Sequence, residues 1–352
     1  FFFFHILLEM QKNVLKESPY SINKAVKILN NDGIVALKTE TVYGIACNPN
    51  SIFSIQSVYN LKKRPLFNPL IIHVNTLEMA KKVAVFNDLS KKIAKYFWPG
   101  PLTLILPRRK NKLIEDFAVS GLETIALRIP NSTVFQKVLK KFKKPIAAPS
   151  ANPSGYISST NARHVSDSFG KKIELIIDSG KSHFGLESTI LDLSKKKLSI
   201  TRQGMITPEV IKKIIGINIE ISDNLIKKQK PISPGQTKKH YAPNTPLKMN
   251  VRNPKKGDAL LFFGNNNNYT FNPSLNLSKK GDLYEAAQNL FDYLRKLDKL
   301  RMKRIAVTPI PFEGIGKTIN ERLMRASVNG QKKNLKIYFT SLIILNIPLT
   351  KI

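Results

Sequence analysis

Apolar residues recur at helical and then at extended spacing along most of the chain, starting near residue 20. The spacing from Ile22 to Leu29 predicts a helix over 21–32 with Ser21 as its N-cap. A second helix is expected over 51–64, with Ile52 on its inward face. The remaining predicted strands lie at 33–39, 69–74, 98–107, 124–130, 145–152, 174–180, 188–194 and 198–204, and further helices at 87–97 and 207–215. Because strands and helices intermix, the pattern indicates an α/β fold with a mixed, twisted sheet.

The pattern changes near residues 221–245, where the segment at 222–246 is polar, carries four prolines and shows little periodicity. Such a segment is typical of a linker, and connections of this length are often functional. Beyond it, apolar runs predict strands at 247–251, 258–264 and 304–310. Helices are expected over 282–300, with Leu283, Ala286, Ala287, Leu290 and Leu294 inward, and over 319–327. These elements predict a second, smaller α/β (Rossmann-like) domain.

The chain therefore divides into five predicted parts. These are an N-terminal extension at 1–15, a catalytic domain at 16–220, a linker or lid at 221–245, the smaller domain at 246–330 and a tail at 331–352. Residues 1–9 precede Met10 and are interpreted as a fragment or an upstream translation. The apolar runs at both ends are shorter than the roughly 20 residues of a membrane span, so no membrane contact is expected.

The formal net charge of +33 is the unusual feature of the composition. It favours a polyanionic partner such as a nucleotide or RNA. Codon bias explains it equally well, because Lys, Asn and Ile are all abundant. One cysteine, Cys47, and five scattered histidines exclude an internal disulfide and a multi-cysteine zinc site. No metal site is therefore expected, and a reducing cytoplasm is the expected compartment.

Several short motifs place hydroxyl and basic side chains beside predicted strands. The loop TETVYG (39–44) offers two threonine hydroxyls, and the end of the second helix brings Lys62 and Arg64 together, where their heads can converge on one anion. Ser150 and Asn152 share a face of a strand end. Each motif alone also fits a polar turn or a solvated helix end. No P-loop, GxGxxG or GxSxG pattern is present.

The order of the motifs is more specific than any one of them. KTETVYG, KxRPxxNPLIxH, WPGPLTLIL, ALRIPN, APSANPSG, GLESTI, RxG and SPGxxxxHYAP follow one another along the chain. This series resembles the threonylcarbamoyl-AMP synthases of the YrdC-like superfamily. EGIGKTINERLMRA resembles the second domain of the long form, so that the resemblance covers about residues 16–330.

The resemblance implies a YrdC-like twisted mixed sheet and a nucleotidyltransferase. Such an enzyme makes threonylcarbamoyl-AMP and pyrophosphate from L-threonine, bicarbonate and ATP, with Mg²⁺ accompanying the nucleotide. The product would pass to a threonylcarbamoyl transferase machinery that modifies the tRNA adenosine next to the anticodon, and a weak tRNA contact is expected. No protein nucleophile is needed, because the carbamate of threonine attacks the α-phosphate and the site supplies positioning and charge.

The resemblance also implies roles for single residues. The motif pair K-x-R and S-x-N places the catalytic roles on Lys62, Arg64, Ser150 and Asn152. ATP contacts fall on Arg64, Asn68, Thr124, Ser150, Ser158 and Arg202, and on Lys238, His240 and Tyr241 of the lid. Threonine contacts fall on Thr41, His73, Arg128 and Ser188. Lys38 stands where the family often has proline and is expected at the site entrance; Thr237, Lys238 and Lys239 also depart from the family pattern.

Two other functions fit parts of this pattern. A basic protein of this type could bind RNA or the ribosome without catalysis, and its binding would then weaken steeply with salt. A carbamoyl transfer from carbamoyl phosphate is the other alternative. Proteins of that kind carry zinc-finger cysteines, however, and this chain has one cysteine.

Overall fold

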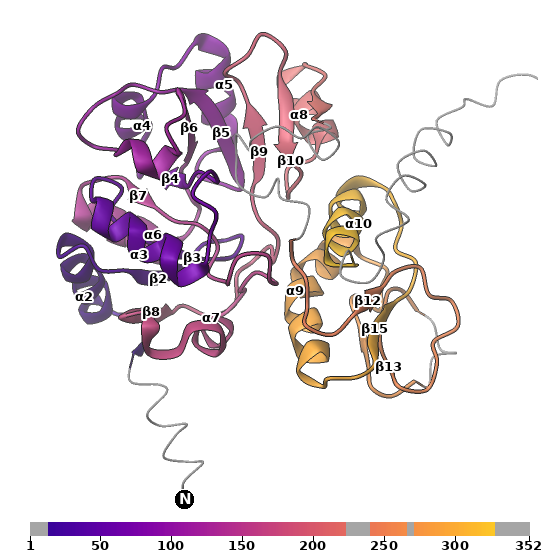
Figure 1. Ribbon diagram of the computed structural model, residues 1–352. Coiled ribbons are helices and arrows are strands. Elements are labelled where there is room, and N and C mark those ends of the chain that lie inside the picture. The colour runs from indigo at the N-terminus through magenta and orange to yellow at the C-terminus, as the bar shows by residue number, and fades with distance from the viewer. Residues whose placement is uncertain (1–12, 223–239, 266–270, 328–352) are drawn as a thin grey trace, which may run out of the picture.

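The computed structural model describes residues 13–222, 240–265 and 271–327, which form two α/β domains (Figure 1). Most of the predicted N-terminal extension, most of the lid with Lys238, and the tail lie outside the described residues. Of the helices in the described ranges, none is long and apolar enough to cross a membrane.

The first sheet of the larger domain has the order β1-β8-β2-β3. β1, β8 and β2 are parallel, and β3 is antiparallel to β2. Leu37 and Ile177 on one face of this sheet pack under helices α2 and α6, whereas Ala36 and Ile176 on the other face join the central core of the domain. These elements are β1 (Val14–Lys16), α2 (Pro19–Asn30), β2 (Val35–Lys38), β3 (Tyr43–Ala46), α6 (Thr133–Phe142) and β8 (Leu175–Asp178).

The second sheet has the order β11-β10-β9-β5-β6-β4-β7 and mixes parallel and antiparallel pairs, as expected. Its strands are β4 (Ile71–His73), β5 (Leu102–Pro107), β6 (Thr124–Arg128), β7 (Ile146–Ala147), β9 (Thr189–Asp192), β10 (Ser199–Arg202) and β11 (Glu220–Ile221). The remaining helices of the larger domain are α3 (Ile52–Lys62), α4 (Leu77–Val83), α5 (Asp88–Phe97), α7 (Ala162–Phe169) and α8 (Pro208–Ile215), with short 3₁₀ turns η1 (Asp116–Val119) and η2 (Gly170–Lys172). Of these, α7 packs against β8 and β2 of the first sheet.

The two sheets meet where β3 crosses β7. Cys47 and Ala147 exchange backbone hydrogen bonds, and the Ile45 amide donates to the Pro149 carbonyl at 2.9 Å. A side chain at Gly44 would press on Ala148 and Pro149, so the glycine permits this close approach. Cys47 itself is fully buried at the crossing, and burial raises the pKa of its thiol.

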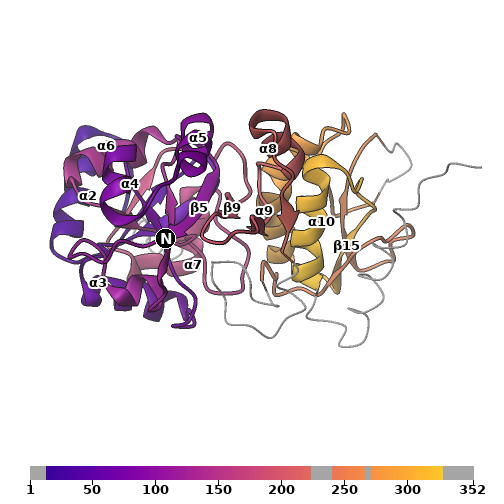
Figure 2. The ribbon, with the colours of Figure 1, turned by 90° about the horizontal axis from the view of Figure 1, so that it is seen from above.

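The smaller domain is a four-stranded parallel sheet of order β12-β15-β13-β14 with two helices. Figure 2 shows both helices between β15 and the larger domain. Its elements are β12 (Leu247–Lys248), β13 (Asp258–Phe262), β14 (Ser274–Asn276), α9 (Leu283–Lys299), β15 (Arg304–Val307) and α10 (Gly314–Ser327).

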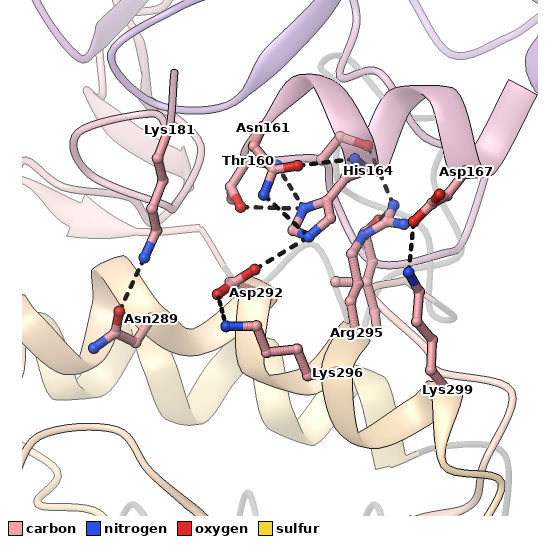
Figure 3. A network of polar contacts seen from close by, with 12 residues as sticks. Thr160, Asn161, His164, Asp167, Lys181, Asn289, Asp292, Arg295, Lys296 and Lys299 are labelled. Atoms are coloured by element: carbon pink, nitrogen blue, oxygen red, sulfur yellow. Dashed lines mark hydrogen bonds and ion pairs between the residues drawn. The ribbon is translucent and has the colours of Figure 1, made fainter. Parts of the chain in front are cut away.

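Helix α9 docks on the larger domain through a polar network (Figure 3). His164 Nε2 lies 3.1 Å from Asp292 Oδ1, and Lys299 pairs with Asp167 at 2.6 Å. Arg295 Nη2 donates to the Ile157 carbonyl at 2.5 Å. Burial lowers the pKa of His164 more than the nearby charge of Asp292 raises it. The ring is therefore neutral, and its Nε2 donates to Asp292. The two domains are thus joined by directional contacts as well as by apolar packing.

The structure corrects four details of the expected elements. Ser18, not Ser21, is the N-cap of α2; Ser21 is the N3 partner in a capping box. Ile52 is 48% exposed because it stands at the first turn of α3 rather than over the core. The loop TETVYG is shorter than expected, since Tyr43 already begins β3. Helix α10 begins at Gly314, five residues before the predicted start.

Candidate active site

A polar cavity lies at the junction of the two sheets of the larger domain. Residues from the β2–β3 turn, β4, β6, the segment after β7, and β10 form its wall, and His240 lines it from the chain that leads into the smaller domain. The lining side chains are Thr39, Thr41, Val42, Tyr43, Arg64, Ile71, His73, Arg128, Ala148, Pro149, Ser150, Glu187, Ser188, Arg202 and His240, together with Gly44.

Arg128 lies at the end of β6 and is bound on three sides. Its Nε donates to the Gly100 carbonyl at 3.1 Å, and Nη1 donates to Thr41 Oγ1 at 3.0 Å. Nη2 lies 2.7 Å from Glu40 Oε1 but has no hydrogen-bond partner within the described ranges. A guanidinium that lines a cavity and is held in place by two hydrogen bonds is suited to bind a carboxylate.

His73 lies beside Arg128, because β4 and β6 pair these two residues in register. Burial and the positive charge of Arg128 lower the pKa of His73 to about 3, so the ring is neutral near pH 7. Among the residues described, nothing hydrogen-bonds its Nδ1. A buried polar atom without a partner is unusual, and here it belongs to a residue that lines the cavity.

Arg202 supplies a third cavity arginine from β10. Its Nε donates to the Ser188 carbonyl at 3.0 Å and Nη2 donates to Ser188 Oγ at 2.9 Å. Ser188 Oγ also lies 2.7 Å from Thr103 Oγ1. Burial lowers the pKa of Arg202 to about 10, which leaves it charged near pH 7.

Lys62 and Arg64 do not converge on one anion as predicted. The Lys62 ammonium donates to the Ser150 and Asn152 carbonyls and is not part of the cavity lining. Arg64 does line the cavity, and its Nη2 donates to Asn68 Oδ1 and to the Pro69 carbonyl, both at 2.7 Å. The left-handed backbone of Lys63 separates the two directions.

Two family models match consecutive parts of the chain. Residues 27–204 match the Sua5, YciO and YrdC family, described as telomere recombination, and residues 206–328 match the threonylcarbamoyl-AMP synthase C-terminal domain. The threonylcarbamoyl-AMP synthase of Bacillus subtilis is 33% identical over 87% of this chain and 92% of its own length. The synthase of Pyrococcus abyssi is 34% identical over 88% and 94%. This chain belongs to the threonylcarbamoyl-AMP synthase family.

The fold agrees with that membership. The crystal structure of Pyrococcus abyssi Sua5 complexed with L-threonine superposes with a TM-score of 0.81 at 32% identity, covering 90% of this chain and 96% of that one. The expected two-domain α/β architecture is therefore confirmed.

The structure brings eight of the residues assigned by family resemblance to one cavity. They are Thr41, Arg64, His73, Arg128, Ser150, Ser188, Arg202 and His240. All four assigned to threonine are among them, whereas the ATP group is divided between the cavity and its surroundings. Their roles stay predictions, because a shared cavity does not show what each residue binds.

The other assigned residues lie behind the cavity wall or away from it. Asn68 holds Arg64, and Ser158 Oγ donates to Glu187 Oε1 at 2.5 Å. Asn152 donates to the Pro153 and Tyr156 carbonyls, both at 2.9 Å. Thr124 begins β6, at the end opposite Arg128, and Tyr241 stacks on Phe291 of α9. Lys38, expected at the entrance, instead donates to the Ser179 carbonyl at 2.5 Å.

Sequence reasoning missed Glu187, a buried carboxylate in the cavity wall. Burial alone would raise its pKa, but the charges of Arg322 and Arg202 and the Ser158 hydroxyl outweigh burial, so the pKa is held below its usual range. Glu187 is therefore ionised. The motif GLESTI contained the signal, since a carboxylate beside a buried strand needs a cationic partner.

Across the described ranges, no group of three or more His, Cys, Asp or Glu side chains could hold a metal ion. Glu187, which lines the cavity, and Glu40, which pairs with the lining residue Arg128, each form an ion pair with an arginine.

Proposed function

We propose that this chain is an L-threonylcarbamoyladenylate synthase, a nucleotidyltransferase that uses L-threonine, bicarbonate and ATP. The observation that carries the proposal is the presence of Arg64, Arg128 and Arg202 in one cavity together with a neutral histidine. L-threonine carries a carboxylate and ATP carries phosphates. Because Glu40 pairs with Arg128, Arg64 and Arg202 leave the cavity wall positively charged. Family membership supports the same reaction.

Arg128 binds the threonine carboxylate in this proposal, because its guanidinium lines the cavity and its Nη2, which is ion-paired with Glu40, makes no hydrogen bond within the described residues. Thr41 holds Arg128 in place, and Ser188 and the open Nδ1 of His73 offer hydrogen bonds to the rest of the amino acid. Bicarbonate takes up a proton and loses water to give CO₂, and the threonine amine adds to the CO₂ and loses its protons to solvent, which gives a carbamate. A carbamate oxygen then forms a bond to the α-phosphorus of ATP as the α–β phosphoanhydride bond breaks and pyrophosphate leaves.

ATP lies on the side of Arg64, Ser150 and Arg202 in this proposal. The charged guanidinium groups neutralise the phosphates as the leaving pyrophosphate gains charge. Lys62 holds the segment of Ser150 and Asn152 through hydrogen bonds to their carbonyls. Asn68 and Ser158 do not touch the ligand but hold Arg64 and Glu187 in place through hydrogen bonds. Mg²⁺ enters as the MgATP complex, as part of the substrate.

We further place the reaction in the cytoplasm, where ATP and tRNA are available, and assign the product to a threonylcarbamoyl transferase machinery. Carbamates and acyl phosphates hydrolyse readily, so a site recessed among buried side chains is suited to an intermediate that must survive until it is transferred.

The deciding experiment measures pyrophosphate release from MgATP and bicarbonate, with and without L-threonine, and with L-serine as the control amino acid. We expect release that depends strongly on L-threonine. A folded protein that binds ATP without such release would contradict the proposal. Retention of tRNA that falls steeply with salt would then favour the RNA-binding alternative.

A further inference from the structure

Helix α10 of the smaller domain sends a buried cation, Arg322, across the domain boundary. Its Nε lies 3.2 Å from Glu187 Oε2 in the cavity wall of the larger domain. Nη2 donates to the Gln203 carbonyl at 2.6 Å, and Nη1 pairs with Glu321. Arg322 does not line the cavity itself, so any effect on the cavity passes through the residues that it contacts.

Each carboxylate oxygen of Glu187 is bound by a side chain that belongs to the smaller domain or is itself contacted by it. Oε2 faces Arg322, and Oε1 accepts from Ser158 Oγ at 2.5 Å. The backbone of Ser158 is bound in turn by Arg295 of α9, whose Nε donates to the Ser158 carbonyl at 3.3 Å. Both helices of the smaller domain therefore fix the carboxylate.

The same guanidinium supports His240. Arg322 Cζ lies 4.7 Å from the centre of the Tyr241 ring, and the rings of His240 and Tyr241 are 3.9 Å apart. Because Tyr241 is also stacked on Phe291, its ring is enclosed between α9 and α10. One side chain of the smaller domain thus contacts Glu187 directly and supports His240 through Tyr241.

The electrostatic consequence concerns the charge that the cavity presents. Arg128 neutralises Glu40, which leaves Glu187 as the other carboxylate of the site. With Arg322 absent, the charge of Glu187 would be balanced chiefly by Arg202, a residue of the cavity itself. Arg202 would then be less able to attract an anionic ligand, and an unpaired buried carboxylate would repel that ligand directly.

We propose that Arg322 is a positioning residue of the cavity: it fixes and neutralises Glu187, and thereby leaves Arg202 to act on the phosphates of ATP. This inference rests on the proposed function for the identity of the ligand. It assigns to the smaller domain a part in nucleotide affinity.

The test compares ATP binding by calorimetry, and the ATP KM for threonine-dependent pyrophosphate release, in the full chain. Arg322→Met should weaken ATP binding about tenfold or more, because it leaves a buried charge without its partner. The double variant Glu187→Gln/Arg322→Met removes both charges and should return the affinity to within about threefold of wild type. Arg322→Lys keeps the charge and should lie between wild type and Arg322→Met.

Arg304→Met is the matched control, since Arg304 makes a two-pronged ion pair with Asp258, at 2.7 and 2.8 Å, in the sheet of the same domain. It should lower the thermal midpoint without changing ATP affinity. Wild-type ATP affinity in Arg322→Met, or a folded double variant as weak as the single one, would overturn the inference. If Arg322→Met does not fold, the ATP affinity of the double variant is the deciding measurement. ATP binding is measured without turnover, so failure of the proposed reaction would be seen separately in the wild type.

Discussion

Single side chains in this protein act mainly through fixed charge. Arg64 shows this most clearly, because its guanidinium is bound to the Asn68 and Pro69 carbonyls and yet still lines the cavity. Burial lowers the pKa of Arg64 to about 10, so its charge persists at neutral pH. A charge held in place before the ligand arrives needs no reorganisation during reaction.

Arg64→Ala should therefore lower threonine-dependent pyrophosphate release by about 100-fold, the scale on which loss of one preorganised donor acts. Arg163→Ala, at an exposed position of α7, is the control and should leave turnover unchanged. Circular dichroism should show both variants folded. Turnover of Arg64→Ala near the wild-type level would contradict its place in the site.

His73 makes a prediction about pH. Its folded pKa of about 3 lies below the ordinary value of 6.5, so the unfolded chain binds more protons between these values and stability falls as pH falls through that range. Between pH 7 and pH 5 this group should cost about 2 kcal/mol of unfolding free energy. His73→Gln should remove that part of the pH dependence in urea titrations; an unchanged dependence would show that His73 titrates normally.

At the scale of elements, the turn after β10 controls the shape of the cavity wall. A Cβ at Gly204 would lie 2.3 Å from the Thr189 amide nitrogen and 2.5 Å from the Glu187 carbonyl oxygen. Both are backbone atoms next to Ser188, and α10 also contacts this turn through Thr318 Oγ1, 3.2 Å from the Gly204 carbonyl. A shift of the turn at Gly204 would therefore also displace the cavity wall at Ser188 and the contact with α10.

Gly204→Ala should displace Glu187 and Ser188 and reduce activity about tenfold or more, as misplacement of site residues by about 1 Å does. Gly216→Ala, at the left-handed C-cap of α8, is the matched control, because nothing lies within 4 Å of its Cβ position. It should cost about 1 kcal/mol of stability through backbone strain alone. Equal activity in the two variants would argue against this role of the turn.

The sequence predicted elements where apolar spacing was regular and missed them where tertiary contacts decide. The buried strand β4 and the amphipathic helix α9 were predicted from periodicity and are present. The sequence predicts a loop at Tyr43 and Gly44, whereas the structure makes them part of β3, because they pair with β2 and lie against the segment of β7. Contacts of that kind are not encoded in local spacing.

At the scale of the whole molecule, the site depends on pairs far apart in the chain. Glu187 and Arg322 are 135 residues apart, and Arg128 and Thr41 are 87 apart. The family resemblance implies that Thr41 and Arg128 bind one ligand, and the structure places them in contact. The motifs could not predict Arg322, since an arginine in a polar helix is indistinguishable from a surface residue until the domains meet.

The net charge of +33 belongs to this scale as well. The cavity arginines are buried and poorly screened, whereas exposed lysines are screened within about 8 Å at 0.15 M salt. Raising salt from 50 to 200 mM should change threonine-dependent turnover by less than about threefold, and should weaken any tRNA retention by about tenfold or more. Filter binding beside the turnover assay checks this. A parallel fall of both would mean that surface charge governs ATP capture.

The burial of Cys47 at the crossing of the two sheets makes the chain suited to site-selective chemical labelling. Its thiol is enclosed and its raised pKa keeps it protonated, so maleimides should not react with it in the folded protein. Because the chain contains one cysteine, cysteines introduced at the exposed Tyr96 and Tyr284 would carry the dyes, one in each domain. Fluorescence energy transfer between them could then follow the distance between the domains during turnover, with the native thiol left in place.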